Sequence, residues 1–431
     1  MTRPDPVTEL ADRLDDFVAA AVHPDEIAAL LESDGLTDDL IRERYGADSS
    51  FALAEQLYTR VPRRHPEPRP AADPWRVGLL PCLLRGIVFA LPGFGYVLAA
   101  PLLGPSATLP LLTAALFGWA WNQGVSHRAY TWLGLGDKRA ARDTLLRGGA
   151  TGAVLGTVTA APFASTPLLF AAAAQSCYLA AATALLVLGR ERALLTALLP
   201  LTAGATVTLV HPIPVAARVG VLTLSLTSVV TLALLDVLSR GQACRRAARV
   251  GAAAPRERGQ ARPTPTAPPL AGSLPYALFA LASGALVVHT ALDDVRTAAA
   301  LTLSMGPAEY LLYRFRSATR TTLRSATTPR AFRRRTTHHI ALTLTTYLAT
   351  LLALTSTLTL ATPDPTLLIL GTVIWTGLLL QSFGAVTGPA LVCTAAALAQ
   401  PFADTATVHV LAAIAQLTLV RIHLGRATAH R

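Results

Sequence analysis

Stretches of mostly apolar residues recur along the chain from residue 79 to residue 423, with short polar segments between them. About 20 apolar residues in a helix cross the hydrocarbon core of a bilayer. The pattern therefore predicts an all-α polytopic membrane protein with about 12 transmembrane helices. These are expected at residues 79–103, 107–125, 149–164, 166–188, 193–211, 217–238, 273–291, 297–313, 338–361, 365–382, 385–401 and 405–423.

The polar segments divide these helices into larger parts. A long polar segment follows the sixth stretch, so we expect two six-helix bundles at residues 77–238 and 273–424. Two stretches, 149–164 and 385–401, are short and rich in Gly, Ala and Thr, so each is either a span, half of a longer helix or a buried segment. The remaining parts are an acidic helical cytoplasmic headpiece (1–60), a basic Pro-rich tether (61–76), a disordered basic Pro-rich cytoplasmic linker (239–272) and a cytoplasmic tail (425–431).

Basic residues alternate between the segments that connect the spans. With the N-terminus inside, the segments assigned to the cytoplasm hold 29 Lys or Arg, and the external side holds only Arg218, at the start of the sixth span, and Arg296. Cytoplasmic loops carry this excess in membrane proteins. The pattern predicts a multi-pass protein with both termini in the cytoplasm. Because the chain is rich in Ala and Arg and has a single lysine, Lys138, we expect the inner membrane of a bacterium with a GC-rich genome.

The composition excludes several classes of protein. Hydrophobic residues make up 52% of the chain and charged residues 15%, with a mean hydropathy of +0.45, against about 25% charge in soluble domains. The four cysteines are widely spaced, which argues against a disulfide framework or a thiolate zinc site. Although the pI is about 10.1, the positive charge follows the spans, so we expect membrane lipids and not nucleic acid as partners.

The headpiece has its own pattern. Three or four short helices are expected: Pro24 starts one that Gly35 ends, Thr37 caps the next, and Ser49 or Ser50 caps another. Their apolar faces consist of Ile27, Leu30 and Leu31, then Leu40 and Ile41, then Leu53, Leu57 and Tyr58. Residues 1–59 contain 14 acidic and four basic side chains, a net charge of −10. The headpiece is either a solvated module or a docking site for a basic cytosolic protein or for the chain's own basic loops.

Residues 130–149 carry a family resemblance. When the sequence is aligned with itself at an offset of 188 residues, Gly118–Arg128 falls on Gly306–Arg316, which suggests two parallel repeats. The connecting segment in the first repeat is similar to the loop after the second span of the multidrug/oligosaccharidyl-lipid/polysaccharide (MOP) flippase superfamily. The matching residues are Gly134, Gly136, Asp137, Leu145, Leu146 and Arg147. The resemblance implies alternating access between two six-helix bundles, with a helix on the inner face after the turn. The corresponding segment 314–337 lacks the Gly-Asp element.

Polar residues inside the apolar stretches are the candidate site. A carboxylate there is costly and usually functional, so Glu309 is expected to carry a coupling proton or to pair with Arg85. The alternative is that it lies close enough to the inner interface to be solvated, because Arg314 follows within five positions. Arg85 otherwise reaches a lipid headgroup or a substrate phosphate. The other pathway candidates are Asn122, Gln123, Gln175 and Gln381, which either bind a polar headgroup or join helices. The Pro92–Gly95 segment breaks the first span and marks either a hinge or close packing.

The motifs of common enzymes do not occur in the sequence. It has no Walker loop, no HExxH and no GxSxG, and neither His338-His339 nor Asp293-Asp294 has a complete ligand set nearby. We therefore expect no enzymatic activity, no metal and no cofactor. The resemblance implies a flippase-like transporter of a lipid-linked or amphipathic cell-envelope precursor, for example a lipid-linked saccharide. The alternative is a non-transporting scaffold that recruits cytosolic proteins for wall assembly or division through residues 1–60.

Overall fold

The chain forms two compact units, residues 1–73 and residues 74–431. The computed structural model describes residues 5–64, 73, 75–251, 267–293, 295–359 and 364–430. These residues form helices and connecting turns, with no β-strand among them. The expected all-α class is therefore confirmed, and the headpiece folds as a unit of its own.

The headpiece contains five short helices, one or two more than expected. They are α1 (Pro6–Arg13), α2 (Asp15–Ala20), α3 (Pro24–Ser33), α4 (Asp38–Tyr45) and α5 (Ser50–Arg60). Thr37 caps α4 as predicted, and Ser49, one of two candidates, caps α5. Its core includes Ile27, Leu31, Ile41, Leu53 and Leu57, all fully buried. The prediction for Leu40 is wrong: it lies 41% exposed on the outer face of α4, a helix short enough for Ile41 alone to fill the core position.

The tether begins later than expected because arginines after α5 pack back on the headpiece. Arg64 forms an ion pair with Asp15, and the Arg63 guanidinium lies over the Tyr58 ring. The Arg64 amide also donates to the Ala19 carbonyl. The rest of the predicted tether, apart from residues 73 and 75–76, lies outside the described residues.

Within the described residues, each predicted apolar stretch of the second unit is helical. The helices are α6 (Leu79–Ala90), α7 (Gly93–Leu103), α8 (Thr108–Gly134), α9 (Lys138–Ala160), α10 (Thr166–Val187), α11 (Glu191–Val210), α12 (Val215–Gly251), α13 (Leu274–Asp293), α14 (Val295–Ser325), α15 (Pro329–Thr359), α16 (Pro365–Ser382), α17 (Thr387–Ala399) and α18 (Thr405–Leu424). The first stretch is divided between α6 and α7 at Pro92, where the sequence indicated a break. Asp137, Asp364 and Asp404 cap α9, α16 and α18 through their carboxylates.

Seven helical segments among the described residues are long and apolar enough to cross a membrane. They are Leu79–Leu103, Thr166–Val187, Val215–Leu238, Leu270–Thr290, Pro329–Thr359, Pro365–Ser382 and Thr405–Leu424. The outside of this unit exposes many large apolar side chains, including Phe170, Val154 and Leu398. Exposed apolar surface on this scale marks contact with lipid or protein. The chain is thus a multi-pass helical membrane protein.

Several expected loops are in fact extensions of helices. The predicted loop at 126–148 consists of the ends of α8 and α9 around a turn at residues 135–137, so no separate helix precedes the third span. Likewise, α14 and α15 leave only residues 326–328 between them in the predicted loop 314–337. The predicted linker at 239–272 begins in helix, since α12 extends to Gly251, while residues 252–266 lie outside the described residues. A hydropathy pattern detects only the apolar part of a helix, which explains these errors.

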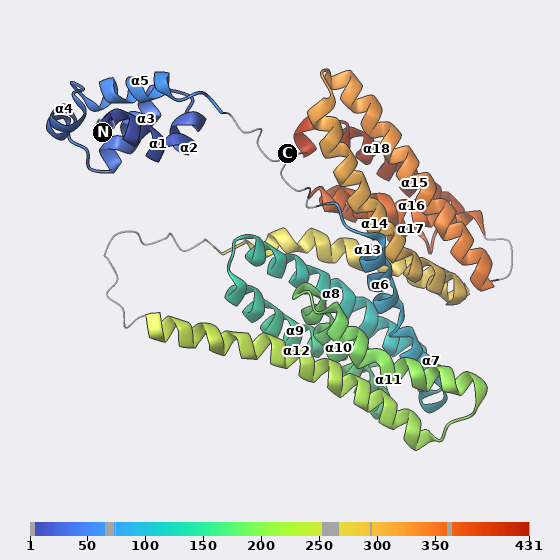
Figure 1. Ribbon diagram of the computed structural model, residues 1–431. Coiled ribbons are helices and arrows are strands. Elements are labelled where there is room, and N and C mark those ends of the chain that lie inside the picture. Colours follow the sequence, from blue (N-terminus) through green and yellow to red (C-terminus); the bar gives the residue numbers. More distant parts are fainter. Residues whose placement is uncertain are drawn as a thin grey trace. The chain divides into compact units, whose positions relative to one another are not determined.

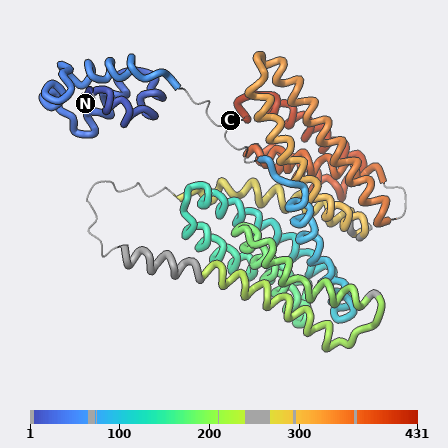
Figure 2. Tube along the Cα trace, in the orientation of Figure 1, coloured from blue at the N-terminus to red at the C-terminus, as the bar shows by residue number. Residues whose placement is uncertain are grey.

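Two hydrophobic cores occupy different parts of the sequence. The larger core of the first half contains buried residues from Val88 to Val237, and the core of the second half contains buried residues from Phe279 to Leu424. A smaller cluster, with buried residues from Ala107 to Ala172, also lies in the first half. In Figure 1, α8–α12 and α14–α18 form separate groups with α6 and α13 between them. Figure 2 shows the same grouping along the Cα trace.

The helix contacts repeat from one half to the other. Within the halves, α8 packs on α9 and α14 on α15, α10 on α12 and α16 on α18, and α11 on α12 and α17 on α18. Between the halves, α6 packs on α14, and α13 packs on α8. The three pairings within the halves thus occur in the same order in both halves of the sequence.

Candidate functional site

The candidate site lies where α6 crosses α14. Gly86 and Gly306 bring the two backbones into contact: a Cβ on Gly86 would lie 2.8 Å from the Gly306 Cα, and one on Gly306 would lie 2.9 Å from the Cys82 carbonyl oxygen. Small residues allow such close approach between membrane helices. Glycine is therefore required on both sides of this crossing, one residue from Arg85 and three from Glu309.

Arg85 joins three helices through an ion cluster. Its Nη1 donates to Glu309 Oε1 of α14, and its Nη2 donates to Glu191 Oε1, at the start of α11, over 2.7 Å. The three side chains are partly buried, with 35%, 22% and 27% of Arg85, Glu309 and Glu191 exposed. Of the two roles expected for Glu309, pairing with Arg85 is therefore present.

The cluster contains more negative than positive charge. With both carboxylates ionised, one guanidinium faces two carboxylates, and the three side chains carry a formal charge of −1. Tyr313, one turn after Glu309, lies beside both Arg85 and Glu309. A partly buried group with one excess carboxylate has the chemistry to take up a proton or a cation, because either would balance its charge.

A second contact joins the halves at the crossing of α8 and α13. The rings of His127 and Tyr276 stack, with centroids 3.8 Å apart and planes at 20°. His127 Nδ1 also lies 3.0 Å from the Ser273 hydroxyl, and Arg128 donates to the Pro268 carbonyl over 2.6 Å. Both crossings between the halves thus have polar contacts near one end of the membrane unit. At this end α8, α10 and α14 end, and α9, α11 and α15 begin. We call this end of the unit the basic end.

A further ion pair at the basic end was not predicted. Arg190, in the turn before α11, donates through Nη2 to Asp236 of α12 over 2.8 Å. This hydrogen bond raises the pKa of Arg190 above its usual value. The sequence signal was present, because Arg190 and Glu191 are adjacent charges between two apolar stretches, but it does not show which helices they reach.

The remaining pathway candidates lie apart from the ion cluster. Gln175 of α10 donates to the Leu111 carbonyl of α8 over 2.9 Å, the helix-joining role that was one of its two expected roles. Asn122 is buried on α8, and its Oδ1 has no hydrogen-bond partner among the described residues. Gln123, next to it, and Gln381, near the end of α16, are half-buried, and neither takes part in the cluster.

Residues 130–149 form the turn and the helix cap that their sequence predicted, although no separate helix lies between the turn and the predicted third span. Gly136 adopts a φ of +82°, which L side chains rarely adopt, and the Asp137 carboxylate accepts hydrogen bonds from Arg139 and Ala140. Gly134 ends α8, Leu145 is buried, Leu146 packs against the core of the first half, and Arg147 is exposed. The segment thus consists of the end of α8, a tight turn at residues 135–137 and the start of α9.

The comparisons with known proteins do not assign a family. No family model, no curated protein and no solved structure matches the chain. The resemblance of residues 130–149 to the MOP superfamily therefore stays a prediction, and the function is argued from the site itself. Within the described ranges no three potential ligands gather into a metal site; Asp294 of the acidic pair lies outside those ranges.

Proposed function

We propose that the chain is a flippase-like transporter that moves a lipid-linked or amphipathic cell-envelope precursor by alternating access. The observation that carries this proposal is the ion cluster that links α6 of the first half to α14 of the second. A contact of this kind must break if the halves separate at the basic end. It therefore has the position required of a gate.

The proposal extends to the number of spans. If the helices outside the seven apolar segments also cross the membrane, the chain has twelve spans in two six-helix bundles. In this arrangement the polar residues of α8 and α14 face protein and not lipid. Two observations support this arrangement: each buried hydrophobic cluster lies within one half of the sequence, and three helix pairings occur in both halves. With the basic end in the cytoplasm of a bacterial cell, both termini are cytoplasmic, as the positive-inside rule favours.

The cluster supplies a mechanism for coupling. With Glu309 ionised, Arg85 holds α6 and α14 together at the basic end. Protonation of Glu309 from the aqueous phase removes its charge and leaves Arg85 balanced by Glu191 alone. The attraction across the crossing then falls, the basic end opens, and loss of the proton closes it again. Membrane potential or a cationic group on the substrate would act on the same excess negative charge.

The test is a lipid extraction from a host strain that lacks the gene, scored by mass spectrometry for polyprenyl-linked saccharides. We expect a precursor that accumulates in the deletion strain and disappears on complementation with the wild-type chain. Glu309→Gln keeps the size of the side chain and removes its charge, so it should fail to complement at normal protein level. Glu43→Gln, a change of the same kind on the exposed face of α4, should complement fully. Full complementation by Glu309→Gln would contradict the gating role.

A second candidate function is a non-transporting scaffold for wall assembly or division. The specific observation in its favour is the headpiece, which has its own core and a strongly acidic surface. The same deletion strain separates the two functions. A scaffold should lose function when residues 1–60 are removed and retain it with Glu309→Gln, with an unchanged lipid profile and misplaced wall growth. A transporter should show the opposite sensitivity.

A further inference from the structure

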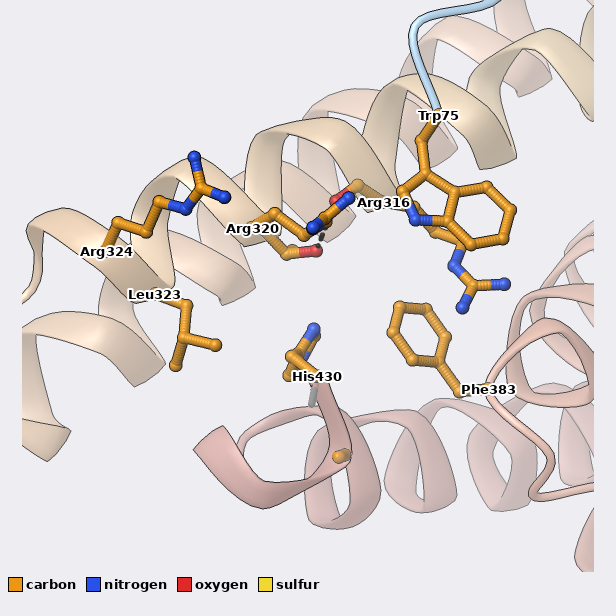
Figure 3. Close-up of a pocket in the computed structure, with 9 residues that line it drawn as sticks. Trp75, Arg316, Arg320, Leu323, Arg324, Phe383 and His430 are labelled. Carbon is orange, nitrogen blue, oxygen red and sulfur yellow. Dashed lines mark hydrogen bonds between the residues drawn. The ribbon is translucent and has the colours of Figure 1, made fainter. Parts of the chain in front are cut away.

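A cavity of about 420 Å³ opens at the basic end beside the last turns of α14. Its wall consists of Trp75, Arg316, Thr319, Arg320, Leu323, Arg324, Phe383, Ala429 and His430. Figure 3 shows the three arginines along one helix, with Trp75 and Phe383 near the first of them. Pockets for small ligands have volumes of roughly 300–1,000 Å³. The cavity is thus large enough for a polar headgroup.

The first arginine is held in a fixed position. The Arg316 guanidinium lies 3.6 Å from the centre of the Trp75 ring and 4.9 Å from that of Phe383. Its Nη1 also donates to the Ser382 carbonyl over 2.7 Å. These contacts restrict the guanidinium before any ligand arrives, which lowers the entropy that binding would cost.

The other two arginines follow at helical spacing. Arg320 and Arg324 come four and eight residues after Arg316, so all three lie on one face of α14. Both line the cavity; Arg324 is exposed, and Arg320 is half-buried. Guanidinium groups present paired donors that fit the oxygens of phosphate. Three of them on one wall give the cavity a strong preference for an anion.

The remaining wall combines a neutral polar group with apolar side chains. His430 lies in a short 3₁₀ helix (Ala427–His430), and burial lowers its pKa, so its ring is neutral at neutral pH. Its Nε2 lies 3.0 Å from the Leu424 carbonyl oxygen, which fixes the ring beside Phe383. Leu323 and Phe383 add apolar surface next to the charged groups. The cavity therefore suits a ligand with a charged part and an apolar part.

We propose that this cavity binds the phosphate of an anionic phospholipid headgroup. The arginines hold the phosphate oxygens, and Leu323 and the aromatic side chains contact the glycerol and the first carbons of the acyl chains. The position at the ends of membrane helices, with a tryptophan beside the arginines, corresponds to the headgroup level of a bilayer. The proposal goes beyond transport, because the bound lipid is a constituent of the membrane and not the molecule that is moved.

The test uses the purified full-length chain in a neutral detergent, titrated with phosphatidylglycerol or phosphatidylcholine, with bound lipid counted by native mass spectrometry. The test variant is the double substitution Arg320→Gln with Arg324→Gln. The matched control, Arg330→Gln with Arg334→Gln, removes the same charge from exposed positions of α15 outside the cavity. Inorganic phosphate and glycerol 1-phosphate serve as soluble competitors.

We expect phosphatidylglycerol to bind and phosphatidylcholine to bind at least about tenfold more weakly. The test variant should lose about tenfold in affinity for phosphatidylglycerol, because two partly exposed charge contacts are removed, and the control variant should not change. If the double variant does not fold, Arg324→Gln alone, at an exposed position, should lose about threefold.

Three results would overturn the proposal. An equal loss in the control variant would mean that total surface charge, and not the cavity, attracts the lipid. Equal binding of phosphatidylcholine would remove the preference for an anionic headgroup. Soluble phosphate or glycerol phosphate that binds as tightly as the lipid would make the site one for a water-soluble ligand. None of these measurements depends on transport, so the proposed function and the lipid site fail independently.

Discussion

Arg85 illustrates which contacts of single residues are predictable from sequence. A lone arginine and a lone glutamate within apolar stretches have a strong reason to meet, so the pair with Glu309 was among the expected roles. Glu191 was not expected to join them, because it lies beside a short turn and looks solvated in the sequence. The arginines around the cavity were missed for a similar reason: they were counted only as loop charges that fix orientation.

Asp5 gives a prediction at the same scale. Its carboxylate accepts a hydrogen bond from Arg60 over 2.7 Å, which holds the pKa of Asp5 below the usual 3.8. The pair therefore stabilises the headpiece above about pH 4, and this contribution is lost as the pH falls through the lowered pKa. In a fragment of residues 1–64, Arg60→Gln should lower the melting temperature near pH 7, and this effect should shrink as the pH falls below about 4.

Circular dichroism during heating measures this difference. Arg13→Gln, which removes an exposed arginine of the same headpiece, should give a smaller and less pH-dependent change. A constant effect of Arg60→Gln at all pH values would show that the ion pair with Asp5 is not its cause.

At the scale of helices, the helices of the membrane unit were predictable, but their ends were not, and the headpiece has one or two helices more than its sequence predicted. The apolar stretches predict α6 to α18 because a span needs a run of apolar residues. The polar extensions of α8, α14 and α15 carry no such signal, so they were assigned to loops. Turn chemistry was more informative: Gly136 and Asp137 fix the end of α8 and the start of α9.

The crossing of α6 and α14 gives the prediction at this scale. Gly306→Ala places a methyl group 2.9 Å from the backbone oxygen of Cys82, which neither helix accommodates without moving apart. Overpacking of this kind costs about 1–3 kcal/mol. We expect a lower melting temperature and reduced complementation. Gly220→Ala on α12, where a Cβ meets nothing within 4 Å, should leave both unchanged. Equal stability of the two variants would contradict the close crossing.

At the scale of the whole molecule, the sequence predicted a headpiece and a membrane unit because their compositions differ sharply. How the membrane helices pair was not predictable in the same way. The contacts of α6 with α14 join residues about 220 positions apart, and those of α13 with α8 join residues about 150 positions apart. They form through small residues and aromatic rings that leave no periodic signal. The shift of 188 residues suggested a repeat, but it does not show which helices pack on which, whereas the helix contacts do.

The turn after α8 has a practical consequence. Lys138, the only lysine of the chain, is exposed immediately after that turn, at the basic end. Its ε-amine is thus a single internal target for a sulfonated succinimidyl ester, a reagent that does not cross lipid bilayers. Peptide mass spectrometry should find Lys138 unmodified in intact spheroplasts and modified in inside-out vesicles. Modification in intact spheroplasts would place the basic end outside the cell. One side chain thereby reports the orientation of the whole protein.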